Sequence, residues 1–380
     1  INVVIVPRAN PDGAASGQHA TASGAELSRD HLLLSTWEAQ ALARLTSDYQ
    51  PTVVLDAREY PVPGNTLARF GALPRSDAML QYATTANLPE FLTKAAEEWY
   101  RRPLQAALKG QGLSNEWSYT ASADPAERKI AVGNAQPDAG ANPEGLKNII
   151  SLVLESRGAG LGRLDIQRRV HTHVIGMTSV LGSTAQRAKE LGQLRPYLDK
   201  EVSTQACKGE ALVEAAPTPA PHTLTLLDPR SGADKTFSVE ASSALTLQPL
   251  KKRVRPCGYW LSNASKTAAE RLRLQGLQVR RVLRQSALLG DLYTARAPKP
   301  EVRAASGTAP LPPEVSLVRG VIDAPAGSYY IPLNQPLANL AIAALEPDTP
   351  ASYVSRQLIP GLSSIGRVMS EPAMESEALP

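Results

Sequence analysis

The first 60 residues carry the pattern of a strand, a turn, a helix and a second strand. Ile1–Val6 is a largely apolar, β-branched run, typical of a strand buried on both faces of a parallel sheet. Asn10–Gly13 (Asn-Pro-Asp-Gly) is strong turn punctuation after it. Thr36–Leu45 has apolar residues at helical spacing, and Thr52–Leu55 is a second apolar run. We therefore expect an α/β fold that binds its ligand at the carboxyl ends of the strands.

The next 140 residues continue the alternation. Pro89–Gly112 has apolar residues at helical intervals, interrupted by Pro103, and Asp165–Leu198 reads as a long helical region. Tyr119–Asn142 is polar and contains Gly and Pro, which indicates a loop. Ile149–Leu154 is an apolar strand that ends at Glu155. The expected fold class is α/β, with a mixed, mostly parallel sheet flanked by helices.

The composition shifts after Cys207. The Ala/Pro-rich stretch Glu214–Pro221 and the Pro-rich stretch Ala297–Pro313 read as linkers, and Thr223–Leu250 alternates as strands do. Thr267–Leu274 is a predicted helix and Val279–Leu283 a predicted strand. We expect an α/β domain over residues 1–205, incomplete at its N-terminus because it opens inside a strand, and a smaller β-rich C-terminal region over residues 206–380.

Composition narrows the class of function. The chain has 380 residues, is 43% hydrophobic, and carries a net charge of +4 from 40 basic and 36 acidic residues. The basic clusters Lys251–Arg253 and Arg280–Arg284 lack interleaved aromatic residues, so they predict solvated surface and no nucleic-acid partner. No apolar stretch is long enough to span a membrane.

The two cysteines, Cys207 and Cys257, are 50 residues apart and do not make a disulfide framework. They form one bridge in an oxidising compartment or remain two small buried thiols, and the spacing favours neither. It is not the Cys-x-x-Cys spacing of a metal or redox site.

Several motifs together resemble the zinc metallocarboxypeptidases of the carboxypeptidase A type. The chain has Asn-Pro-Asp-Gly at 10–13, Gly-Ala-Glu-Leu-Ser-Arg-Asp at 24–30, and Val-Val-Leu-Asp-Ala-Arg-Glu-Tyr at 53–60. Ile149–Gly158 has the form of the strand that ends in the family's general base, and Ala326–Pro347 extends the likeness near the C-terminus. We identify the chain by this resemblance as a bacterial member truncated upstream.

The resemblance implies roles for individual residues. Arg29, with Ser28 at a position where the family has Asn, would hold the C-terminal carboxylate of a peptide substrate. Glu155 would be the general base, and His19 is the nearest candidate for the group that polarises the scissile carbonyl. A guanidinium is a natural bidentate receptor for a carboxylate, and a base beside a pocket activates water. The resemblance also implies a peptide or small carboxylate substrate and a periplasmic or secreted location.

The chain departs from the family at the metal. Arg58 occupies the position of the third zinc ligand, and a guanidinium has no lone pair to donate. The first two ligands of the family lie in a His-x-x-Glu motif, which does not occur in this chain. The resemblance implies zinc as the family's cofactor, but the missing ligands make zinc doubtful in this chain. Arg58 would instead pair with Glu155 and neutralise it.

Two functions from different classes follow. In the first, the chain hydrolyses C-terminal peptide bonds; in the second, it is an inactive relative that binds carboxylates or peptides, or is structural. Non-functional interpretations stay open as well: Glu155 could pair with Arg157, and Arg29 could be a surface residue at a helix start. His171 and His173 lack the i, i+4 spacing of a zinc-binding helix.

Overall fold

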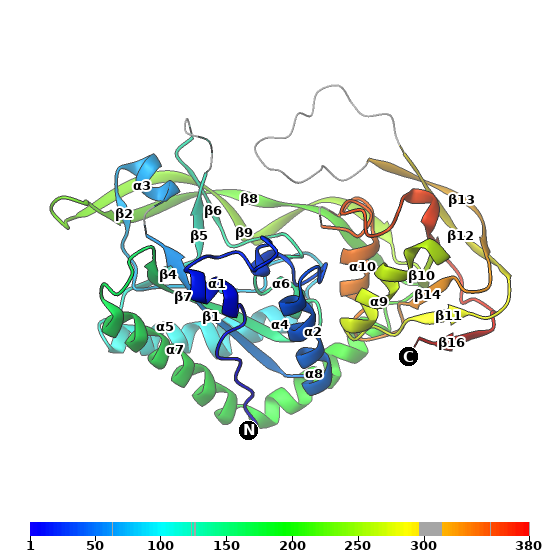
Figure 1. The fold of residues 1–380 in the computed structure, drawn as a ribbon, viewed down its shortest axis with the longest axis horizontal. Coiled ribbons are helices and arrows are strands. Elements are labelled where there is room, and N and C mark those ends of the chain that lie inside the picture. The colour runs from blue at the N-terminus through cyan, green and yellow to red at the C-terminus, as the bar shows by residue number, and fades with distance from the viewer. Residues whose placement is uncertain (63, 123, 125–126, 296–313, 350, 380) are drawn as a thin grey trace.

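The computed structural model describes residues 1–380 apart from 63, 123, 125–126, 296–313, 350 and 380. It contains a four-stranded, a five-stranded and a seven-stranded sheet, with helices packed around them (Figure 1). The expected α/β class with mixed sheets flanked by helices is confirmed. The predicted linker Ala297–Pro313 lies outside the described residues.

The four-stranded sheet has the order β1–β7–β3–β4. The strands are β1 (Val53–Pro61), β7 (Ile150–Ala159), β3 (Ala78–Tyr82) and β4 (Asn115–Trp117). β1 runs parallel to β7 and β3 runs parallel to β4, whereas β3 and β7 are antiparallel. The sheet is therefore mixed and mostly parallel, as the sequence predicts.

Helices cover one face of this sheet. They are α4 (Glu90–Ala95), the π-helical segment η2 (Ala96–Arg101), α5 (Arg102–Gly110), α7 (Ile166–Gln186) and α8 (Ala188–Ser203). Leu80 and Leu154 of the sheet pack against Leu104 and Leu108 of α5. A Cβ at Gly176 of α7 would overlap the side chain of Leu154, so this glycine lets the helix approach β7 closely. The helices expected at 89–112 and 165–198 are thus confirmed, the second as α7 and α8.

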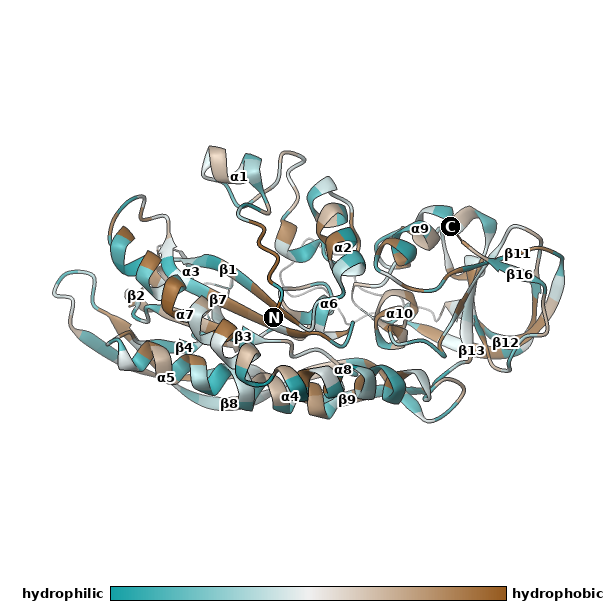
Figure 2. Cartoon of the chain, turned by 90° about the horizontal axis from the view of Figure 1, so that it is seen from below, coloured by the Kyte–Doolittle hydropathy of each residue, from teal (hydrophilic) through white to brown (hydrophobic). Residues whose placement is uncertain are grey.

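The N-terminal segment differs from the expectation. Ile1–Val6 forms no strand, and the side chain of Ile5 is 77% exposed; Figure 2 shows the segment as a hydrophobic coil leading to α1 (Pro11–Ser16). An apolar run becomes a strand only when a neighbouring strand pairs with it, and none of the described strands does. Asn10–Gly13 begins α1 rather than a plain turn, because Asn10 caps the helix by accepting from the Gly13 N–H.

The helix and the strand predicted to follow the N-terminal segment are both present. The helix expected at 36–45 is α2 (Trp37–Tyr49), with Thr36 as its N-cap, and the run at 52–55 begins β1. The polar stretch 119–142 is not only loop, because it contains β5 (Tyr119–Ala121) and β6 (Lys129–Val132), before the short helix α6 (Asn142–Gly145). These strands are too short to leave a clear alternation in the sequence.

The five-stranded sheet has the order β2–β8–β9–β6–β5, with β2 at Leu73–Pro74, and is built around a long hairpin. Its strands β8 (Glu210–Leu227) and β9 (Asp234–Val254) extend along the molecule toward the C-terminal sheet (Figure 1). The prediction of a linker at 214–221 is therefore wrong, because this segment lies within β8. Pro217, Pro219 and Pro221 are spaced by two, so they remove N–H donors from one edge of β8 only, and β9 pairs with the other edge.

The C-terminal region is β-rich, as expected. Its seven-stranded sheet surrounds a core that includes the fully buried helix α10 (Ala338–Leu345), and α9 (Lys266–Leu274) is the helix expected there. The strand order is β13 (Val315–Ala324), β12 (Ser286–Ala295), β15 (Ile365–Val368), β10 (Gly258–Leu261), β14 (Tyr329–Pro332), β11 (Arg280–Val282) and β16 (Ser376–Ala378). The predicted strand at 279–283 is β11.

One of the two basic clusters is not solvated surface. Arg253 is buried, and its guanidinium lies 2.5 Å from a carboxylate oxygen of Glu346 and from one of Asp348. Lys251, on the same face of β9, lies 2.5 Å from Asp348. A cluster on a strand points alternately to two faces, so part of it meets the acidic residues that follow α10. The cluster at 280–284 is mostly exposed, as expected.

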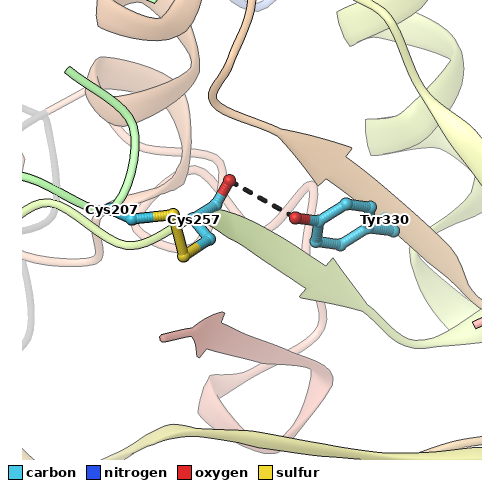
Figure 3. The surroundings of a disulfide bond; sticks show 3 residues. All are labelled: Cys207, Cys257 and Tyr330. Carbon is cyan, nitrogen blue, oxygen red and sulfur yellow. Dashed lines mark hydrogen bonds between the residues drawn. A yellow bond between two sulfur atoms is a disulfide. The ribbon is translucent and has the colours of Figure 1, made fainter. Parts of the chain in front are cut away.

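Cys207 and Cys257 form a disulfide, with 4.3 Å between their Cα atoms (Figure 3). The Tyr330 hydroxyl donates to the Cys257 carbonyl at 3.3 Å. The bridge closes a loop that contains the whole β8–β9 hairpin, and in the chain-entropy account a loop of this length stabilises the fold by about 4 kcal/mol. None of the described helices is long and apolar enough to cross a membrane.

Candidate functional site

Arg58 and Glu155 are neighbours on adjacent parallel strands. The register of β1 and β7 places them side by side, and Arg58 Nε lies 3.1 Å from Glu155 Oε1. The contact is an ion pair without hydrogen-bond alignment, since the buried Arg58 Nε has no hydrogen-bond partner among the residues that the structure describes. The pairing expected from the sequence is therefore present. Arg157, the other partner considered, lies instead near Asp165, at 3.7 Å.

The sequence led us to expect that the strand ends at Glu155, but it does not. β7 continues to Ala159 and pairs with β1 as far as Pro61. The apolar run stops at Glu155, but the backbone ladder does not, because Ser156 and Arg157 still pair with Glu59 and Tyr60 of β1. The Glu155 side chain is 13% exposed, and its Oε2 accepts from the Ser118 hydroxyl at 2.7 Å.

A glycine joins this ion pair to the loop that carries Arg29. Gly140 adopts a left-handed backbone (φ +55°), and a Cβ there would lie 3.8 Å from Arg58 Nη2. Its N–H donates to the Ser28 carbonyl at 3.1 Å. Gly140 thus lies beside the Arg58 guanidinium and is hydrogen-bonded to the backbone of the residue before Arg29. Among the described residues no hydrogen bond or ion pair joins the Arg29 guanidinium itself to Arg58 or Glu155.

Within the described part of the chain, Arg29 has only a loose ion-pair partner. It ends the single turn of 3₁₀ helix η1 (Leu27–Arg29), and its Nε lies 3.8 Å from Glu26 Oε2, with both side chains more than half exposed. Its charge also acts on Asp138: burial raises the pKa of that carboxyl, and the Arg356 and Arg29 guanidiniums oppose the rise. An exposed guanidinium held this weakly is free to bind a carboxylate.

His19 and His31 are placed differently from each other. His19 is exposed, its carbonyl accepts from Asn10, and among the described residues no hydrogen bond or ion pair joins its imidazole to Arg58 or Glu155. His31, which the sequence interpretation gave no role, is half-buried. Burial lowers its pKa, while the carboxylates of Glu144 and Asp56 oppose this. Only its position two residues after Arg29 could have signalled it.

The residues present do not fit a three-ligand zinc site. Among the described residues no group of three or more His, Cys, Asp or Glu side chains is placed to hold a metal ion. The position expected for the third ligand carries the cationic Arg58, with Asp56 beside it at 3.7 Å. His171 and His173 lie on α7, and burial lowers the pKa of His173. No catalytic step is therefore assigned to zinc.

Comparison with known proteins adds distant relatives. No protein-family model and no solved structure matches the chain. Carboxypeptidase 2 of Trichophyton rubrum is 22% identical over 368 residues, which is 95% of this chain and 67% of that protein. Probable carboxypeptidase 2 of Arthroderma benhamiae is 21% identical over 351 residues, 91% of this chain and 66% of that protein. The relatives named here are fungal, whereas we expected a bacterial member. Over most of its length the chain is thus a distant relative of carboxypeptidases, which supports a carboxypeptidase family.

Proposed function

We propose that this chain recognises the free C-terminal carboxylate of a peptide through Arg29, as part of a carboxypeptidase-like protein. The observation that carries the proposal is the exposed Arg29 guanidinium, whose Nε lies 3.8 Å from the Glu26 carboxylate, a weak ion pair. The loop that carries Arg29 is hydrogen-bonded through its backbone to Gly140, which lies beside Arg58. Ser28 contributes its carbonyl to that bond. The relatives' name, carboxypeptidase 2, agrees with a peptide C-terminus as the ligand.

Within this proposal Glu155 is the candidate general base for hydrolysis of the last peptide bond. Its carboxylate is mostly buried and accepts from Ser118, which leaves one oxygen, Oε1, facing Arg58. A base must be free to accept a proton, so hydrolysis requires the Arg58 guanidinium to move from Oε1. The poor alignment of this ion pair favours such movement.

The second candidate is a carboxylate-binding module without hydrolysis. The Arg58–Glu155 ion pair favours it, because the Arg58 guanidinium lies against Oε1, the oxygen that would have to accept a proton during hydrolysis. The resemblance also puts the cationic Arg58 at the position where the family has a zinc ligand. For both candidates we propose a secreted or periplasmic location, which the disulfide supports because such bonds persist in oxidising compartments.

Calorimetry with a short peptide and its C-terminally amidated form tests the carboxylate site. We expect the free acid to bind about tenfold tighter, since one charge-assisted hydrogen bond is worth about 1.5 kcal/mol or more. Arg29→Ala should abolish this preference. Arg44→Ala, which removes an exposed arginine of α2, is the matched control. Equal binding of acid and amide by the unmodified chain would overturn the proposal.

Hydrolysis is measured separately, by release of the C-terminal amino acid. If the chain cleaves the peptide, Glu155→Gln should lower the rate by about 10²-fold or more while leaving carboxylate binding intact. If it binds the free acid selectively but does not cleave it, the module without hydrolysis is the correct function. Glu98→Gln is the control, since it makes the same change at an exposed glutamate of η2.

A further inference from the structure

The C-terminal region holds the loop that carries Arg29. Leu32, three residues after Arg29, is fully buried in a hydrophobic cluster made mainly of C-terminal residues, among them Tyr259, Leu277 and Tyr353. Nearly 230 residues of sequence separate Leu32 from the first of these. The loop therefore inserts a side chain into a core to which it does not belong in sequence.

Two polar side chains of that core bind the loop backbone. Gln275 Nε2 donates to the His31 carbonyl at 2.5 Å and to the Leu32 carbonyl at 3.2 Å. The Tyr353 hydroxyl donates to the Leu32 carbonyl at 2.9 Å. Gln275 and Tyr353 are both buried, at 1% and 0% exposure. A buried carbonyl needs a donor, so these two residues fix the backbone of His31 and Leu32.

A third contact from the same region supports the other side of the loop. Arg356, one turn after Tyr353, lies 3.3 Å from the buried carboxylate of Asp138. Asp138 is two residues before Gly140, whose N–H donates to the Ser28 carbonyl. The Arg29 loop is thus bonded on one side to Gln275 and Tyr353, and on the other to a segment held by Arg356.

We infer that Gln275 and Tyr353 are positioning residues of the carboxylate site, and that the C-terminal region sets the affinity and selectivity of Arg29 for a peptide C-terminus. This inference rests on the proposed function. A guanidinium binds a carboxylate tightly only if its backbone is already in place, because ordering the loop at the moment of binding costs affinity. The two side chains supply that order without touching the ligand.

The test compares two matched double variants. Gln275→Met with Tyr353→Phe removes both donors to the loop and preserves volume. Gln335→Met with Tyr330→Phe is the control: Gln335 donates to the Pro332 and Gln278 carbonyls and Tyr330 to that of Cys257, so the control removes comparable buried bonds from the same region but none to the loop. Peptide acid and peptide amide are titrated into each, and hydrogen exchange is followed at residues 28–34.

We expect the Gln275/Tyr353 variant to lose about tenfold in affinity for the peptide acid and nothing for the amide, with faster exchange at 28–34. The Gln335/Tyr330 variant should keep the acid preference and the slow exchange, and the single Tyr353→Phe variant should lie between. If the unmodified chain prefers the acid and the Gln275/Tyr353 variant keeps that preference in full, the inference is wrong. If the unmodified chain has no preference, the proposed function itself has failed.

Discussion

Two ion pairs that are one residue apart in β1 differ in almost every respect. Glu59 faces α7 and is held by Arg169 through two aligned hydrogen bonds of 2.7 Å, while that arginine also donates to the Gly162 and Leu164 carbonyls. Arg58 faces the other way and meets Glu155 at 3.1 Å with no aligned bond. The first pair has the geometry of a structural contact, and the second has the geometry of a contact that can be exchanged for a ligand.

The surroundings of the two pairs agree with this difference. A Cβ at Gly158 would overlap both the Glu59 carboxylate and Arg169 Nε, so the glycine leaves room for the aligned pair. At the other pair, a Cβ built at Gly140 would lie 3.8 Å from Arg58 Nη2. This is an ordinary van der Waals distance, so the glycine is not needed to make room for the Arg58 side chain. Charged residues on one strand pair therefore separate into a helix-facing structural set and a loosely packed candidate site.

The largest expected effect is the loss of the structural pair. Arg169→Ala removes both guanidinium donors from the Glu59 carboxylate, which keeps only the Ser156 hydroxyl at 3.5 Å, and should lower the free energy of unfolding by about 3 kcal/mol, measured by urea denaturation. Arg163→Ala removes an exposed arginine just before α7 and is the control. A loss no larger than that of the control would show that the pair does not stabilise the fold and would remove the contrast.

A second helix-facing pair should give acid sensitivity. Burial raises the pKa of Asp77, but hydrogen bonds from Arg168 and Ser114 outweigh it, so the pKa is lowered in the folded protein. The stabilisation is then complete above the unfolded pKa of about 3.9 and is lost as the pH falls through the lower folded value. Asp77→Asn should cost about 2 kcal/mol at pH 7 and little at pH 2.

Urea denaturation at the two pH values measures this, with the exposed Asp48→Asn as the control. An Asp77→Asn variant that loses as much stability at pH 2 as at pH 7 would mean that packing, and not the charge of Asp77, is responsible for the effect.

The pair at the candidate site should matter less for stability. Arg58→Ala breaks a partly exposed, misaligned ion pair, and Glu155 keeps its bond from Ser118, so we expect a loss of about 1 kcal/mol or less. The same denaturation experiment measures it. A loss as large as that of Arg169→Ala would mean that Arg58 is a structural residue, and the comparison between the two faces would fail.

Hydrophobic periodicity predicts the helices at 37–49, 90–110 and 166–203 and the strands at 53–61 and 150–159, but not the short strands β5 and β6. The expectation that Arg58 meets Glu155 comes from the family resemblance and not from periodicity. The sequence does not predict that Leu32 enters the C-terminal core or that Gln275 binds the His31 carbonyl. These contacts join residues far apart in the chain, and no local pattern records them. Ile1–Val6 shows the converse: its β-branched composition is right for a strand, but a strand also needs a pairing partner.

The smallest expected effect is at the metal position. Arg58→His replaces the cation at the expected third-ligand position by a group that can ligate zinc, but a catalytic zinc site needs three protein ligands. One new imidazole beside Asp56 and Glu155 does not complete the family's set, so zinc titration followed by calorimetry should show no tight binding. The unmodified chain is the reference. Stoichiometric, tight zinc in the Arg58→His variant would mean that neighbouring carboxylates complete a site, and the arginine would then be all that keeps a metal away from Glu155.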